Sequence, residues 1–231
     1  MVNKTDFTIQ DLINEAVRQD RKNVKQSFWH PSALGSCLTG AYLIRKGIAE
    51  KKFDDRTLRV FNVGRMFEDW LSTLLIKQDV DFRTQIGLGG KIENETLVPS
   101  EKKESEIAGY ADLMINGVVY EIKSKHSRGL QYTPNYHHKL QLWTYLKCLG
   151  KPEGRLLYLS KDDLRVKEYS VFLNDEGLEA EVVRELKVLN EAWKQGLPPQ
   201  PVEDKKDWRY KYCNIHEEYC LKQPEYLKGQ E

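Results

Sequence analysis

Apolar residues recur along the chain at two spacings, one typical of helices and one typical of strands. Apolar side chains every three or four residues predict helices over residues 8–20, 37–47, 56–78, 136–149 and 174–195. Alternating apolar and polar residues predict strands over 81–88, 109–115, 118–123, 154–160 and 165–172. Residues 91–106 are polar and rich in acids, and we expect a loop there. A hairpin, a crossover helix and a further strand predict an α/β architecture, a central mixed sheet flanked by helices.

The most informative stretch is a pair of strands joined by Asn116-Gly117. Asn-Gly between alternating β-prone runs is the strongest short signal for a hairpin with a two-residue turn. This turn sets Asp112 opposite Glu121 and Tyr110 opposite Lys123. Opposed carboxylates repel each other within a sheet, whereas a divalent cation binds clustered carboxylate oxygens. We therefore expect one face of the hairpin to be core and the other to present two acids and an ammonium group.

Two acids and a lysine on one strand face suit metal-dependent hydrolysis of phosphodiesters. Carboxylates can hold divalent ions that activate water and bind phosphate oxygens, and a lysine can orient the nucleophile or offset developing charge. Gly64 and Glu68 lie one turn apart on the predicted helix 56–78. A glycine inside a helix costs about 1 kcal/mol relative to alanine, so we expect another element to approach closely at Gly64. The alternative for Glu68 is a solvated charge beside Asp69.

Four motifs in this order resemble those of the PD-(D/E)xK nucleases, in their RecB-like branch, which includes CRISPR adaptation nucleases and phage and viral exonucleases. The motifs are Gly64-x-x-x-Glu68, Asp112, Glu121-Ile122-Lys123 and Gln141-x-x-x-Tyr145. The family commonly has histidine where this chain has Glu68. The resemblance extends from about Pro31 to Cys220. It implies a single nuclease domain, 1–231, with a restriction-endonuclease-like core over about 56–172 and helical additions at 1–55 and 173–231.

The resemblance also implies an activity and a role for each motif residue. It implies a metal-dependent DNA nuclease, an exonuclease on single-stranded DNA or duplex ends. Asp112, Glu121 and Lys123 would be catalytic, with Lys123 assisting the attacking water. The ligands of Mg²⁺ or Mn²⁺ would be Glu68, Asp112, Glu121 and the Ile122 carbonyl. The residues expected to bind the substrate strand are Gln141, Tyr145, Lys125, Arg128 and Lys139.

A second set of candidate ligands lies near the two ends of the chain. Iron–sulfur members of the branch carry one cysteine near an N-terminal Pro-Ser motif and three near the C-terminus. This chain matches at Cys37, Cys213 and Cys220, and it has Tyr210 at the place of the remaining cysteine. Three alternatives stay open. His216 completes a zinc or cluster site, a cluster has a non-cysteine ligand, or the thiols pack together without a metal.

Charge and composition narrow the function without identifying it. The net charge of +1 does not indicate a nucleic-acid partner by itself. Residues 121–155, however, carry seven lysines and arginines against two acids, so the basic excess is local and begins at the hairpin. No apolar run is long enough for a membrane span and the N-terminus lacks a signal region, so we expect a cytoplasmic protein with no membrane partner. DNA is the expected partner, and protein partners stay open.

Two alternatives to an independent exonuclease remain. One is a CRISPR-adaptation-type factor that processes DNA within a complex. The other is a nucleic-acid-binding protein that keeps the fold without cutting. The complete acid–acid–lysine set argues against the second alternative, because an idle site has no reason to keep two opposed carboxylates.

Overall fold

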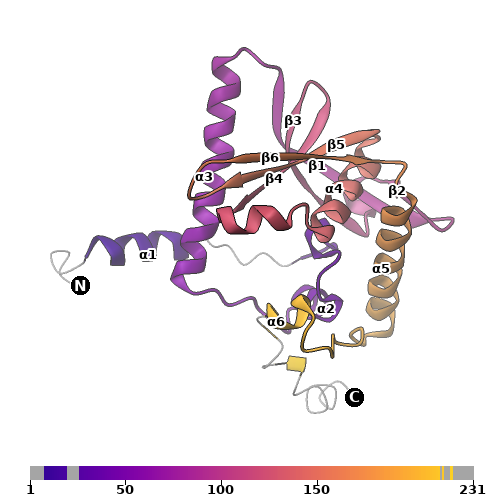
Figure 1. Cartoon of the computed structure of the whole chain (residues 1–231). Coiled ribbons are helices and arrows are strands. Elements are labelled where there is room, and N and C mark those ends of the chain that lie inside the picture. Colours follow the sequence, from indigo (N-terminus) through magenta and orange to yellow (C-terminus); the bar gives the residue numbers. More distant parts are fainter. Residues whose placement is uncertain (1–7, 20–25, 214, 216–218, 221–231) are drawn as a thin grey trace.

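Six strands form one mixed sheet at the centre of the protein (Figure 1). The computed structural model describes residues 8–19, 26–213, 215 and 219–220. The order across the sheet is β2-β1-β3-β4-β5-β6, with β4 and β5 parallel and all other neighbours antiparallel. The predicted α/β class with a mixed sheet is confirmed. In chain order the strands are β1 (Phe82–Glu93), β2 (Thr96–Pro99), β3 (Ile107–Ile115), β4 (Val118–Lys125), β5 (Glu153–Ser160) and β6 (Val166–Phe172).

Helices cover both faces of this sheet. They are α1 (Ile9–Gln19), α2 (Leu38–Lys46), α3 (Asp55–Lys77), α4 (Tyr136–Leu149), α5 (Glu176–Gln195) and α6 (Trp208–Lys211), with 3-10 turns η1 (Pro31–Ala33), η2 (Lys102–Glu104) and η3 (Ser127–Tyr132). In Figure 1, α3 stands upright at one side of the sheet, α1 extends away from it, and α2 and α6 lie close to each other. No described helix carries an apolar stretch long enough to cross a bilayer.

The core has two parts, one on each face of the sheet. Phe67, Leu71 and Leu75 of α3 pack on a small cluster that includes Leu113 and Ile122. The larger cluster joins α2, α4 and α5 to the sheet, and its members include the fully buried Trp143 together with Met114 and Val119. The prediction of a single buried hairpin face is therefore wrong, because Met114 and Val119, which alternate with the predicted core positions, are also buried.

The helices begin and end close to their predicted boundaries, because residues that favour helix caps can be recognised in the sequence. The Asp54 carboxylate accepts the Thr57 N–H at 2.7 Å and caps the start of α3. Gly47, Gly150 and Gly196 end α2, α4 and α5 in the left-handed conformation that glycine adopts without strain. The crossover helix α4, which links the parallel strands β4 and β5, matches its predicted range of 136–149.

The predicted loop at residues 91–106 is wrong, because much of it is a β-hairpin. β1 continues to Glu93 and β2 pairs with it from Thr96 onward. Asn94 and Glu95 form the turn, and both have positive φ angles, 45° and 66°, as a type I′ turn requires. These strands are hard to recognise in the sequence because β2 is only four residues long and lies within a polar stretch, at the edge of the sheet.

Gly154 permits the tight packing of β5 between β4 and α4. A Cβ at this position would lie 2.8 Å from the Val119 carbonyl oxygen and 2.9 Å from Leu146 Cδ2. We expect Gly154→Ala to lower the free energy of unfolding by about 1–3 kcal/mol, the usual cost of overpacking a core. Urea unfolding measures this change. Gly129→Ala is the matched control, because its Cβ would meet only ordinary contacts at 3.8 Å or more; equal unfolding midpoints for the two variants would contradict the prediction.

Candidate active site

The sheet is interrupted on both sides of Asp112. On one side, β3 pairs with β4 only as far as Leu113 opposite Tyr120. On the other side, the pairing of β1 with β3 skips Gln85, which stands opposite Asp112 by register. The Ile122 N–H donates instead to Asp112 Oδ2 at 2.8 Å. The carboxylate of Asp112 thus reaches across the opening between β3 and β4 and replaces a backbone acceptor.

The predicted hairpin register is confirmed near the turn and ends before the two acids. Ile115 lies opposite Val118, as the Asn-Gly turn predicts. The expected ladder pair of Asp112 and Glu121 is not formed, which corrects the prediction. Two facing carboxylates repel, and β4 instead continues alongside β5, where Glu121 is paired with Leu156.

Glu121 is a buried carboxylate held by a lysine. Its side chain is 1% exposed, and Oε1 forms an ion pair with the ammonium of Lys123, whose side chain is 25% exposed. Oε2 is buried and has no hydrogen-bond partner among the described residues. Burial raises the pKa of Glu121 to about 8; the charge of Lys123 opposes this shift and that of Asp112 adds to it. Burial alone would lower the pKa of Lys123, but the neighbouring carboxylates outweigh it and keep the lysine charged.

Glu68 of α3 faces this opening from the helix side. Glu68, Asp112 and Ile122 line one cavity of about 120 Å³. Burial, followed by repulsion from Asp112, raises the pKa of Glu68 to about 7. The expected close approach at Gly64 is made by β4, because a Cβ there would lie 3.3 Å from Ser124 Oγ. The glycine therefore lets α3 lie close enough to β4 to bring Glu68 to the strands.

The donors of this site fit a hard divalent cation. Carboxylates from α3, β3 and β4 gather there, and burial raises the pKa of all three. One buried Glu121 oxygen has no hydrogen-bond partner within the described part of the chain. In the part of the chain that the structure describes, no three acidic, histidine or cysteine side chains already converge as the ligands of one ion. Lys123 occupies the place of a counter-ion to Glu121, so a bound cation would share that carboxylate with the lysine.

Gln141 and Tyr145 lie one turn apart on α4, as predicted, and both are buried. The Gln141 side-chain amide donates to the Tyr145 hydroxyl at 2.7 Å. Burial, followed by the charge of Glu121, raises the pKa of Tyr145, so its hydroxyl stays protonated beside the acids. At 6% and 4% exposure, the pair presents little surface to a substrate and lies where it can orient Glu121.

The three predicted phosphate contacts have different surroundings. Lys125 lies on β4 and donates to Asn135 Oδ1 at 2.8 Å, and burial lowers its pKa. Arg128 is exposed on η3, and Lys139 is half-buried in the first turn of α4. All three thus lie on the segment that leads from the acidic site into the crossover helix.

The N-terminal and C-terminal cysteines approach each other, as the resemblance to iron–sulfur members leads us to expect. Cys37 stands at the N-cap position of α2 without a capping side-chain bond, and a hydrogen bond from the Cys213 thiol lowers the pKa of Cys37 to about 5. Burial, followed by the charge of Cys37, raises the pKa of Cys220 to about 11, so the third thiol is near. His216 lies outside the described residues. Cys148 is buried in α4, away from this group.

Gln85 is a site residue that the sequence did not reveal. It lines the cavity with Glu68 and Asp112, and its φ of 51° is unusual for a residue other than glycine inside a strand. Backbone conformations of this kind concentrate at functional sites. A glutamine within an alternating strand does not by itself indicate a functional site. Gln85 is recognised from the structure, because the pairing of β1 with β3 skips it opposite Asp112.

The fold and the order of the motifs are similar to those of the PD-(D/E)xK nucleases, in their RecB-like branch. No family model matches the chain. The chain is 33% identical over 109 residues to the CRISPR-associated exonuclease Cas4 of Saccharolobus solfataricus, and this match spans 46% of each chain. The chain therefore matches less than half the length of that relative.

Similarity to solved structures extends over most of the chain. The crystal structure of SSO0001 has a TM-score of 0.63 and 20% sequence identity, and it covers 92% of this chain and 96% of its own. The crystal structure of an alkaline exonuclease from Laribacter hongkongensis has a TM-score of 0.49 and 11% identity, with 79% and 93% coverage. The similarity to SSO0001 shows a shared fold over most of the chain.

Proposed function

We propose that this protein is a divalent-metal-dependent nuclease that hydrolyses the phosphodiester bonds of DNA, as an exonuclease on single strands or duplex ends. The observation that carries the proposal is the opening of the sheet at Asp112, beside the buried pair of Glu121 and Lys123 and across from Glu68. The local similarity to an exonuclease named as such supports the choice of DNA and of exonucleolytic action.

The residues divide into metal ligands and groups that act on water. Glu68, Asp112, Glu121 and the Ile122 carbonyl would hold Mg²⁺ or Mn²⁺, which supplies activation of water and stabilises charge on the phosphate oxygens. Lys123 keeps its proton beside three carboxylates and reaches solvent with a quarter of its side chain. It can therefore orient the attacking water and offset negative charge that develops on the phosphate.

The surrounding residues position these groups and the strand. The Ile122 N–H holds Asp112 Oδ2 in the opening of the sheet. Tyr145, itself held by Gln141, can donate to the carboxylate of Glu121. The proposed phosphate contacts are Lys125, Arg128 and Lys139, whose loss would weaken DNA binding in a salt-dependent way.

The shape of the substrate tests the exonuclease part of the proposal. We expect the protein with Mn²⁺ to degrade linear single-stranded DNA and to leave covalently closed circular single strands of the same sequence intact. Gel electrophoresis over time distinguishes the two. Cutting of the circle at the rate of the linear strand would assign endonucleolytic action to the same site.

The similarity to Cas4 also favours a second candidate function, a CRISPR-adaptation-type factor that processes DNA within a complex. The same carboxylate site would then act on DNA ends that partner proteins present. Activity of the purified chain alone distinguishes the two functions, because a factor of this kind would need its partners for efficient cleavage.

We also propose that Cys37, Cys213 and Cys220 bind a soft metal centre, zinc or an iron–sulfur cluster. The hydrogen bond between Cys37 and Cys213, the nearness of Cys220 and the lowered pKa of Cys37 support it, since thiolates are the ligands that such centres use. Elemental analysis of the native protein is expected to find iron or zinc, and Cys213→Ser is expected to lose it. Cys148→Ser, at a buried cysteine elsewhere, should keep the metal. A native protein with neither element would contradict the proposal.

A further inference from the structure

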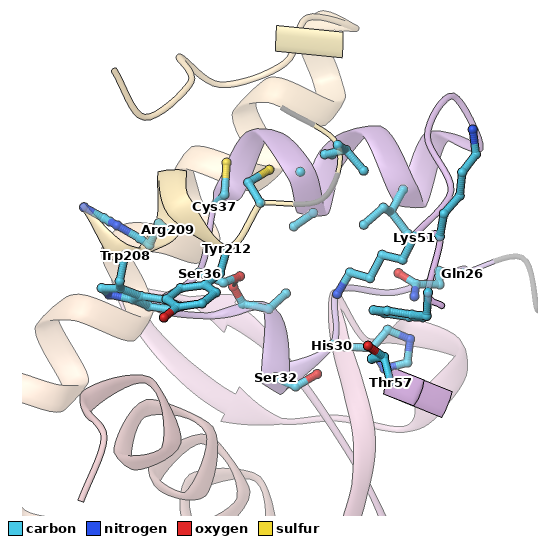
Figure 2. A pocket seen from close by; sticks show the side chains of 18 of the residues that line it. Gln26, His30, Ser32, Ser36, Cys37, Lys51, Thr57, Trp208, Arg209 and Tyr212 are labelled. Atoms are coloured by element: carbon cyan, nitrogen blue, oxygen red, sulfur yellow. Dashed lines mark hydrogen bonds between the residues drawn. The ribbon is translucent and has the colours of Figure 1, made fainter. Parts of the chain in front are cut away.

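A second and larger cavity lies between α2, the start of α3 and α6 (Figure 2). Its volume is about 920 Å³, near the upper end of the range of about 300–1,000 Å³ for ligand sites. Figure 2 shows Trp208 and Tyr212 on one side of it and Lys51 and His30 on the other. None of the carboxylates of the candidate active site lines this cavity, whereas Cys37 and Cys213 of the proposed metal centre do. The rest of its lining is therefore considered apart from the carboxylate site.

The lining of this cavity is basic and aromatic. Among the described lining residues, Asp54 is the sole acid, and its carboxylate is engaged in capping α3. Burial lowers the pKa of His30, and the positive charges of Lys51, Arg45 and Lys102 lower it further. Several cations therefore act on one point of the cavity wall, and such an arrangement favours a polyanion.

The aromatic side chains of the cavity are partly exposed, although one face of Trp208 stacks on His137 with ring centroids 4.8 Å apart. Tyr212 is 82% exposed and Trp208 is 43% exposed, although both line the cavity. Exposed aromatic rings beside lysines and arginines are the usual means of binding unpaired bases, because every base has a face on which to stack. Phe61 of α3 contributes a third ring, 48% exposed, to the same cavity.

Two elements connect this cavity to the candidate active site. On α3, Phe61 and Glu68 are seven residues apart and so lie on one face of the helix, about 10 Å along its axis. On β3, Tyr110 precedes Asp112 by two residues and is 51% exposed. Lys102 donates to the Tyr110 hydroxyl at 3.3 Å, and its charge also reaches His30 at the cavity wall.

We infer that this cavity binds the single-stranded part of a DNA substrate, with bases stacked on Tyr212 and Trp208 and phosphates beside Lys51. The strand runs from the carboxylates past Tyr110 and Lys102 into the cavity. The inference deepens the proposed function, because it names where the uncut strand lies while its end is hydrolysed. It predicts that the cavity contributes affinity and not the chemical step.

Binding without cleavage tests the inference. Fluorescence anisotropy of a labelled oligothymidylate in EDTA measures affinity while metal-dependent hydrolysis is blocked. We expect Tyr212→Ala to weaken binding about tenfold, the effect of losing one stacked base, and Tyr212→Phe to restore it. Lys51→Gln should reduce the slope of log affinity against log salt concentration by about one, the change expected from losing one phosphate contact. The controls are Phe172→Ala, at an exposed ring on β6, and Lys77→Gln, in the last turn of α3.

The outcomes separate this inference from the proposed function. Equal affinities for Tyr212→Ala and Phe172→Ala, together with equal salt slopes for Lys51→Gln and Lys77→Gln, would overturn it. A wild-type protein that binds through Tyr212 and cuts no DNA in Mn²⁺ would contradict the proposed function and leave the cavity assignment standing. A protein that cuts DNA and binds equally well without Tyr212 and Lys51 would contradict the cavity assignment alone.

Discussion

Glu121→Gln is expected to lower the rate of DNA cleavage by about 10²–10⁴-fold, the range that a single positioned catalytic group contributes. Glutamine keeps the shape of the side chain and removes the charge at Oε2, the buried oxygen for which the described residues offer no hydrogen-bond partner. It also leaves the ammonium of Lys123 without its paired carboxylate oxygen. Initial rates on end-labelled single-stranded DNA with Mn²⁺ measure the effect, and circular dichroism shows whether the variant is folded.

A second buried glutamate provides the matched control for this variant. Glu185 of α5 is also 1% exposed, burial raises its pKa, and it accepts the Gly35 N–H at 2.6 Å. Glu185→Gln makes the same chemical change outside the proposed active site and is expected to keep most of the activity. Comparable losses in both variants would assign the effect of Glu121→Gln to the fold and not to catalysis.

The metal-free protein is expected to lose stability as the pH rises from about 5 to 8. Glu68 and Glu121 have folded-state pKa values of about 7 and about 8, above the ordinary glutamate value of 4.5. The folded state therefore binds more protons than the unfolded state in this window, so each proton lost on raising the pH destabilises the fold. A divalent cation neutralises the same carboxylates and should restore stability most at the high end of the window.

Thermal unfolding at several pH values in EDTA and in Mn²⁺ measures this dependence. For a chain of this size, each kcal/mol shifts the melting temperature by roughly 2–4 °C. Glu68→Gln removes one of the repelling charges and should flatten the curve in EDTA. A melting temperature that stays level from pH 5 to 8 without metal, or that Mn²⁺ raises equally at both ends, would contradict the electrostatic account of the site.

Local sequence signals predict much of the fold and many of the residues that form the candidate active site. The Asn116-Gly117 turn identifies the hairpin and its register near the turn. Helical periodicity identifies α3 and α4 within a residue or two, and Gly150 marks the end of α4. The close approach at Gly64 is also borne out, because Ser124 of β4 lies against it. These features share one cause: each depends on a few neighbouring residues whose conformational preferences agree with the final structure.

Features set by non-local contacts could not be predicted. The turn predicts that Asp112 and Glu121 are paired across the hairpin. The strands separate before these residues, because β4 pairs with β5 and the Asp112 carboxylate accepts a hydrogen bond from the Ile122 N–H. The skipped position at Gln85 depends on the partner strand. The sequence does not reveal β2 because the strand has only four residues and lies within a polar stretch. The basic and aromatic cavity joins α2, α3 and α6, which are far apart in the sequence.

We propose that the carboxylates around Asp112 bind a divalent cation with which the protein hydrolyses DNA. This can be measured on end-labelled linear single-stranded DNA with the wild-type protein, first in EDTA and then after addition of excess Mn²⁺, alongside Asp112→Asn. We expect intact DNA in EDTA, stepwise loss of nucleotides once Mn²⁺ is present, and no such loss with Asp112→Asn. Cleavage that continues in EDTA, or that Asp112→Asn supports at the wild-type rate, would contradict it.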